Sequence, residues 1–88
     1  MNYAIEIGED LDKQLFKLSK RDKATFEAIQ KKVREIVQDP YHFKPLKAPL
    51  QNKRRVHISG SFVLIFSIDE ERKAVYFLEF EHHDKAYK

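Results

Sequence analysis

Cysteine is absent from this chain of 88 residues, and glycine and proline are scarce, with two and three residues respectively. The lack of cysteine excludes a disulfide framework, a thiolate metal site and a cysteine nucleophile. The scarcity of glycine and proline leaves little room for linkers, and no internal repeat or low-complexity tract is present. We therefore expect residues 1–88 to form a single domain.

Long apolar runs are also missing. No segment approaches the roughly 20 consecutive apolar residues that a membrane-spanning helix requires. Residues 1–6 do not show the basic and then apolar pattern of a secretion signal. We expect a soluble, cytoplasmic protein without a membrane partner.

Acidic residues are absent between Asp39 and Asp69. This interval carries a formal charge of +5 while the whole chain carries +3, so the remaining residues sum to −2. A one-sided field of this kind attracts phosphates, and a solvated basic surface without a ligand is the alternative. The cations of the interval are Lys44, Lys47, Lys53, Arg54 and Arg55, accompanied by His42 and His57.

The hydrophobic pattern predicts one strand and two helices in the first half of the chain. Residues 3–7 alternate between apolar and polar side chains, as in a half-buried strand. Leucines at helical spacing, with Phe16 widening their stripe, predict a first helix. Ser19 or Asp22 can cap a second helix, which Asp39-Pro40 ends. The short connection predicts an antiparallel hairpin. The apolar face of the second helix comprises Phe26, Ile29, Val33, Ile36 and Val37.

The second half of the chain is predicted to begin with a loop over residues 40–52, anchored to the core by Leu46 and Leu50. Short turns separate the apolar runs that follow, which predicts an antiparallel meander of three strands. These runs cover residues 54–58, 62–68 and 74–80. A strand, two helices and three strands in this order indicate an α+β domain, in which the helices cover one face of a four-stranded sheet.

Alternation along the strands assigns their side chains to two faces of the sheet. The face toward the helices is expected to hold Val56, Ile58, Phe62, Leu64, Phe66, Ile68, Tyr76, Leu78 and Phe80. The uncovered face is expected to hold Arg55, His57, Val63, Ile65, Ser67, Val75, Phe77, Glu79 and Glu81. Because the second face is mixed in charge and partly apolar, it suits a binding cleft.

The C-terminal residues carry side chains suited to proton transfer at neutral pH. They follow the last predicted strand without a flexible spacer, and include His82, His83, Asp84, Lys85 and Tyr87. Because neighbouring strand residues point to opposite faces, we do not expect His82 and His83 to bind one metal ion. Ordinary surface exposure is the alternative role for these histidines, and packing against the sheet edge is the alternative for Tyr87.

Taken in order, these segments resemble the RelE/ParE toxin superfamily, and most of all the RelE-type ribonucleases of archaea and bacteria. The similarity covers nearly the whole chain. It includes the opening strand and helical hairpin, Asp39-Pro40, the 44–47 loop, Arg55-Val56-His57-Ile58, Gly60 with Phe62, and the tail from His82 to Tyr87. The resemblance implies a toxin that a RelB-like antitoxin holds inactive. It also implies cleavage of messenger RNA in the ribosomal A site without a metal or other cofactor.

In the reaction that the resemblance implies, a ribose 2′-hydroxyl attacks the adjacent phosphate and the 5′-oxygen leaves. The resemblance gives catalytic roles to Arg55, His57, His83, Lys85 and Tyr87, with proton transfer by either His57 or His83. It gives phosphate contacts to Lys44, Lys47, Lys53, Arg54 and His82. One position departs from the family pattern, because Val63 stands where many relatives have an arginine. Two alternatives stay open: a ParE-type toxin that acts on DNA gyrase and cleaves nothing, and a member that only binds its antitoxin.

Overall fold

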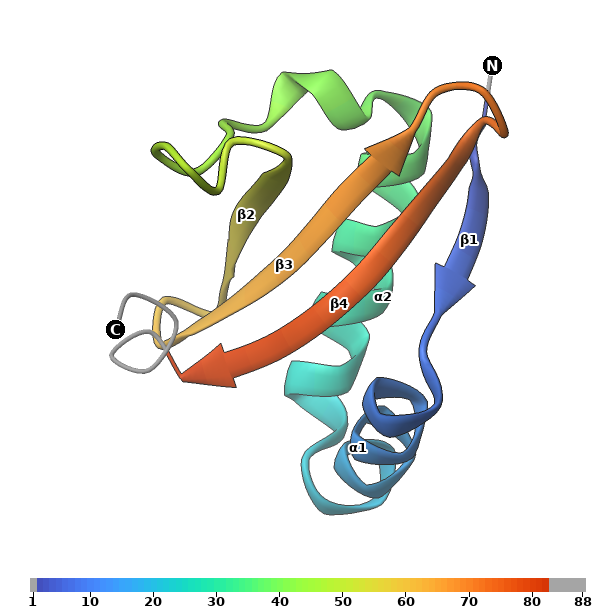
Figure 1. Ribbon diagram of the computed structural model, residues 1–88. Coiled ribbons are helices and arrows are strands. Elements are labelled where there is room, and N and C mark those ends of the chain that lie inside the picture. Colours follow the sequence, from blue (N-terminus) through green and yellow to red (C-terminus); the bar gives the residue numbers. More distant parts are fainter. Residues whose placement is uncertain (1, 83–88) are drawn as a thin grey trace.

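A four-stranded mixed sheet and two helices make up the computed structural model, which describes residues 2–82 (Figure 1). The elements are β1 (Ala4–Ile7), α1 (Glu9–Arg21), α2 (Lys23–Gln38), a 3-10 turn (Pro40–His42), β2 (Lys53–Ile58), β3 (Phe62–Asp69) and β4 (Ala74–His82). The strand order is β1-β4-β3-β2, with β1 parallel to β4 and the other neighbours antiparallel. The predicted α+β class and the meander are therefore confirmed.

Asp22 joins the two helices of the hairpin. It is the C-cap of α1 and the N-cap of α2. Its carboxylate accepts hydrogen bonds from the Thr25 hydroxyl (2.7 Å) and from the Thr25 backbone N–H (3.1 Å). These bonds, led by the one from the hydroxyl, lower the pKa of Asp22. Of the two predicted caps, Asp22 is the one used, since Ser19 donates to the Phe16 carbonyl at 2.6 Å.

The core lies between the helices and one face of the sheet. Its buried members are Leu11, Leu15, Ile29, Ile36, Val37, Val56, Ile58, Leu64, Phe66, Val75, Phe77 and Phe80. Phe26 and Val33 pack against this cluster, so the predicted apolar face of the second helix is confirmed. The prediction for Phe16 was wrong, because its side chain is 64% exposed.

The facing of β4 differs from the expected alternation because the strand contains a bulge. Ile65 pairs with Glu79 and Phe66 pairs with Phe77, so Leu78 is an extra residue between the two pairs. A bulge of this kind reverses the alternation beyond it. Val75 and Phe77 therefore enter the core, whereas Tyr76 is only partly buried and Leu78 is 39% exposed. The predicted core positions of Tyr76 and Leu78 were wrong.

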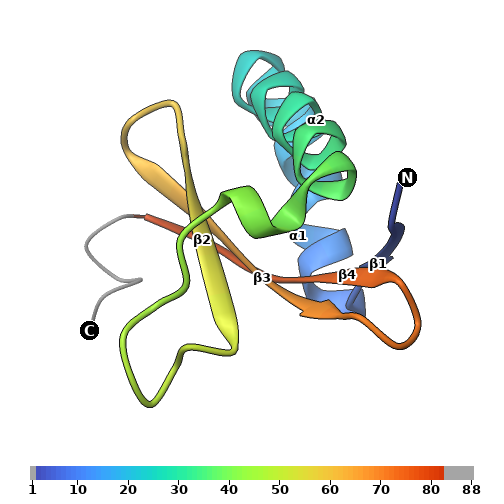
Figure 2. The ribbon, with the colours of Figure 1, turned by 90° about the horizontal axis from the view of Figure 1, so that it is seen from above.

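The loop before β2 is anchored by an aromatic contact. The ring of Phe43 meets that of core residue Phe66 edge to face, with 6.0 Å between centroids. Leu50 is 46% exposed, so its predicted anchoring role was wrong, and Leu46 is partly buried. The Leu46 N–H donates to the Lys53 carbonyl at 2.8 Å, which places the loop along the outer edge of β2. In Figure 2 the loop projects to the side of the sheet away from α2.

A polar cluster ties the start of the chain to the β3–β4 turn. The Glu70 carboxylate accepts hydrogen bonds from the Tyr3 hydroxyl (2.8 Å) and the Tyr41 hydroxyl (2.7 Å), and it is paired with Lys73. Its hydrogen bond with Lys73, followed by those with the two tyrosines, lowers the pKa of Glu70 from its ordinary 4.5 to about 2. The cluster joins three segments that are distant in sequence.

Candidate functional site

Three basic residues of β2 share the sheet face opposite the helices. Val56 and Ile58 enter the core, so alternation directs the residues between and before them to the other side of the sheet. These residues are Lys53, Arg55 and His57, which we call the basic column. Lys53 and Arg55 are partly buried, and His57 is exposed. The predicted positions of Arg55 and His57 on this face are consistent with the strand register.

An apolar strip on β3 separates the basic column from two carboxylates on β4. Arg55 is in register with Ile65, which in turn pairs with Glu79. His57 is in register with Val63, which pairs with Glu81. Two strand spacings put the backbones of the basic and acidic rows about 10 Å apart. We call this arrangement the trough, a name for the order of its rows: cations along β2, a buried apolar strip along β3 and carboxylates along β4.

The centre of this face is not open surface. Val63 is 0% exposed and Ile65 is 2% exposed, so the sequence-based description of the whole face as uncovered was wrong. Val63 is the position where relatives are expected to carry an arginine. Its complete burial means that the side chain here contributes packing to the floor of the trough.

The loop adds two lysines near the start of the basic column. Lys44 and Lys47 are exposed, on the segment that projects away from α2 (Figure 2). The Arg55 N–H contacts the Lys44 carbonyl at 3.4 Å, so the backbone of Lys44 lies directly beside that of Arg55. The loop before β2 therefore places Lys44 alongside the basic column.

Two other predicted site residues lie on the helix side of the sheet. The Arg54 guanidinium donates to the Phe43 carbonyl at 2.5 Å and lies 5.1 Å from the Tyr41 ring centroid. The His82 ring meets that of Phe62 edge to face at 5.6 Å. The structure thus separates Arg54 and His82 from the basic column. His83, Lys85 and Tyr87 lie outside the described residues.

Cations beside a buried floor can bind and polarise a phosphate, and an exposed imidazole can move a proton. Within residues 2–82, no group of three or more histidine, aspartate and glutamate side chains is arranged to hold a metal ion. No helix in the same range has the length and apolar character needed to cross a membrane.

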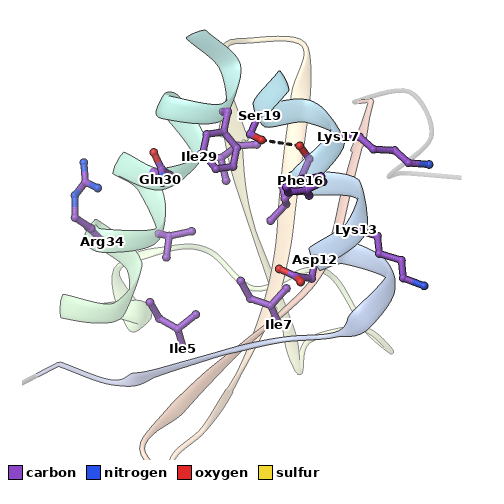
Figure 3. A pocket seen from close by; sticks show the side chains of 13 residues that line it. Ile5, Ile7, Asp12, Lys13, Phe16, Lys17, Ser19, Ile29, Gln30 and Arg34 are labelled. Atoms are coloured by element: carbon purple, nitrogen blue, oxygen red, sulfur yellow. Dashed lines mark hydrogen bonds between the residues drawn. The ribbon is translucent and has the colours of Figure 1, made fainter. Parts of the chain in front are cut away.

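A second surface feature is an apolar groove of about 650 Å³ between β1, α1 and α2 (Figure 3). Ile5 and Ile7 of β1 line one wall, with Phe16 on α1 and Ile29 on α2. Ile5 is 48% exposed and Ile7 38%, so the predicted half-buried strand leaves its apolar side chains accessible. β1 is an edge strand of the sheet, and it contributes Ile5 and Ile7 to the lining of this groove.

Charged residues flank this groove. Lys13 and Lys17 extend from α1 on one side and Arg34 extends from α2 on the other, while Asp12 is the one acidic residue among the described residues of the lining (Figure 3). Sequence reasoning missed the groove because it placed Phe16 in the leucine stripe of the first helix and predicted only a half-buried strand over residues 3–7.

A two-helix hairpin on one face of a four-stranded mixed sheet, with cations on the other face, defines the class of small RelE-like toxins. The family model described as "ParE toxin of type II toxin-antitoxin system" matches residues 4–87. The chain belongs to this family of toxins of type II toxin–antitoxin systems.

Individual relatives agree with this assignment. A Methanocaldococcus jannaschii protein that carries the toxin name RelE4 is 56% identical over 86 residues, which cover 98% of this chain and 92% of that protein. The fold is similar to that in the RelBE2 toxin–antitoxin complex of Mycobacterium tuberculosis, with a TM-score of 0.75, 22% identity, and coverage of 94% and 100% of the two chains. The intact E. coli RelBE complex gives a TM-score of 0.76 at 18% identity, with 91% and 95% covered.

Proposed function

We propose that this toxin cleaves messenger RNA in the ribosomal A site, and that the trough on the sheet face opposite the helices holds the reacting phosphate. The basic column carries the proposal. Lys53 and Arg55 stand in one line with His57 beside a buried apolar strip, and cations so placed stabilise the charge that develops on a phosphate under attack.

In the proposed reaction, the ribose 2′-oxygen forms a bond to the adjacent phosphorus and the bond to the 5′-oxygen breaks. A base accepts the proton of the 2′-hydroxyl, and an acid donates a proton to the departing 5′-oxygen. The products are a 2′,3′-cyclic phosphate and a 5′-hydroxyl, and no metal takes part. We assign phosphate contact to Arg55, Lys44 and Lys47. Proton transfer is assigned to His57 or His83.

The other predicted site residues have separate roles in this proposal. Lys53 extends the phosphate-binding line at the start of β2, whereas we assign Arg54 to holding the loop. His82 is the last residue of β4 and its ring lies on the helix side of the sheet, so we assign it a contact with the RNA outside the reacting phosphate. Catalytic roles for His83, Lys85 and Tyr87 stay predictions from the sequence.

A RelB-type antitoxin is the proposed inhibitor. Solved relatives of the same fold include toxin–antitoxin complexes from M. tuberculosis, E. coli and Pyrococcus horikoshii. We assign the antitoxin to the groove, because its exposed Ile5, Ile7 and Phe16 suit the apolar face of a helix. The flanking Lys13, Lys17 and Arg34 favour an acidic segment.

One observation favours a second candidate. The matching family model is named for ParE. The resemblance described above implies that a ParE-type toxin acts on DNA gyrase and cleaves no RNA. A third function is binding of the antitoxin without catalysis. It follows from Val63, which replaces the arginine that many relatives carry at this position.

Induction of the chain in cells, followed by mapping of messenger 5′ ends, separates these possibilities. Codon-phased cuts inside translated regions are the expected result. Intact messages with arrested replication would instead support the gyrase target, and normal growth would support the binding-only role.

A further inference from the structure

A second group of cations lies at the far end of the basic column. A hollow of about 370 Å³ separates α2 from the end of β2. It is lined by Ala28, Lys31, Lys32 and Glu35 of α2 and by His57, Ile58 and Ser59. His57 thus belongs both to the basic column and to the border of this hollow. The two sites share this one residue of the edge strand β2.

The charge of the hollow is positive. Lys31 is exposed, and within residues 2–82 no carboxylate lies within ion-pair distance of its ammonium. Lys32 meets Glu35 at 3.5 Å, but both side chains are more than a third exposed, and exposed pairs of this type contribute little. Both lysines therefore have ammonium protons to offer to an anion.

The backbone shapes the β2 end of the hollow. Ser59 has a φ of 53°, a left-handed conformation that is uncommon for a residue with a side chain, and Gly60 follows at 77°. This tight turn brings Ser59 to the rim of the hollow beside α2. The turn therefore forms part of the border between β2 and the lysines of α2.

The outer side of β2 is basic at both ends. The loop places Lys44 beside Arg55 at the start of the strand, and α2 places Lys31 and Lys32 beside His57 at its end. A polymer of phosphates that reaches the trough can follow this strand in either direction.

We propose that Lys31 and Lys32 bind phosphates of the RNA backbone next to the reacting nucleotide, and so extend the RNA surface from the sheet onto α2. This inference rests on the proposed function. Lysine ammonium groups act on phosphates as point charges and read no base, so the contact adds affinity and register without sequence preference. The phosphates belong either to the message or to ribosomal RNA, which carry the same chemistry.

The test compares Lys31→Gln/Lys32→Gln with wild type for binding to a single-stranded RNA oligonucleotide and to purified ribosomes over a range of salt. Each lost phosphate contact lowers the slope of log affinity against log salt by about 0.7 on single-stranded RNA. We expect a decrease of about 1.4 for the double variant. Lys20→Gln/Arg21→Gln on α1 removes the same charge outside both sites, and its slope is expected to equal that of wild type.

A smaller slope on the oligonucleotide assigns the phosphates to the message, and a smaller slope on ribosomes alone assigns them to ribosomal RNA. Slopes equal to wild type on both overturn the inference. Cleavage by the wild-type protein is scored on the same ribosomes. If the wild-type protein cuts and the double variant keeps the wild-type slopes, only the α2 contact is overturned. If the wild-type protein does not cut and the double variant has a smaller slope, only the proposed reaction is overturned.

Discussion

Arg54 and Arg55 are neighbours in β2, yet their side chains lie on opposite faces of the sheet. Arg54 reaches the helix side, where it holds the Phe43 carbonyl and lies over the Tyr41 ring. Arg55 stands in the basic column opposite the helices. Of these two adjacent arginines, Arg54 thus makes a structural contact and Arg55 belongs to the proposed RNA site.

This division predicts different outcomes for Arg55→Gln and Arg54→Gln. Loss of Arg55 is expected to lower the salt slope of binding to single-stranded RNA by about 0.7, because one phosphate contact is lost. Loss of Arg54 is expected to leave that slope unchanged and to reduce the free energy of unfolding by about 1–3 kcal/mol, since a charged hydrogen bond disappears. Equal effects of the two substitutions on the slope would contradict the assignment.

His57 is expected to act in proton transfer. In His57→Gln, cleavage on programmed ribosomes should fall by about 10²- to 10⁴-fold, the usual contribution of general acid–base catalysis, while ribosome binding is kept. His42 in the 3-10 turn provides the matched control, and His42→Gln should cleave at the wild-type rate. A His57 variant with an unchanged rate would move the proton transfer to the C-terminal histidine.

The bulge in β4 predicts unequal costs for two neighbouring truncations. Phe77→Ala should lower the free energy of unfolding by about 3–5 kcal/mol, because it leaves a cavity in the core. Leu78→Ala should change it by less than about 1 kcal/mol, because Leu78 is 39% exposed. Denaturant unfolding of both variants measures the difference. The reverse order would show that the strand alternates without a bulge.

The Glu70 cluster predicts a loss of stability in acid. Since the folded pKa of about 2 lies below the ordinary 4.5, the contribution of Glu70 is complete above the higher value and disappears as the pH falls toward the lower one. The unfolding free energies of wild type and Glu70→Gln should therefore differ at neutral pH and converge as the pH approaches 2. A difference that stays constant over this range would mean that the carboxylate charge is not what the cluster stabilises.

The groove predicts a toxin that escapes its antitoxin. Phe16→Glu should remain toxic, since Phe16 is 64% exposed and far from the trough, but co-expression of the antitoxin encoded beside it should no longer restore growth. Leu50→Glu changes a similarly accessible residue outside the groove and should still be neutralised. Full neutralisation of the Phe16 variant would place the antitoxin elsewhere.

The elements were predictable because their signals are local. Ile29, Ile36 and Val37 repeat at helical spacing, and the three apolar runs end at turns, so the hairpin and the meander follow from periodicity. The bulge at Leu78 was not predictable, because it depends on how β4 pairs with β3. Phe16 was misassigned because an apolar side chain looks the same in sequence whether it is buried in the core or exposed on the surface.

The candidate site was predictable in part for the same reason. Arg55 and His57 share a face because strand alternation places them there, and no long-range information is needed. The proximity of Lys31 and Lys32 to His57 depends on the path of α2 across the sheet, so the sequence alone could not bring them together. The burial of Val63 likewise depends on strands that are distant in sequence.

The most direct measurement of the central claim is cleavage of a message whose A-site nucleotide carries a single 2′-deoxy substitution, on ribosomes programmed with that codon. With the ordinary ribose, the wild-type protein should produce a 5′-hydroxyl end and a 2′,3′-cyclic phosphate. With the deoxyribose no cut is expected at that nucleotide, because the attacking oxygen is absent. Cleavage of the deoxy message at an equal rate, or no cleavage of either message, would contradict the proposed reaction.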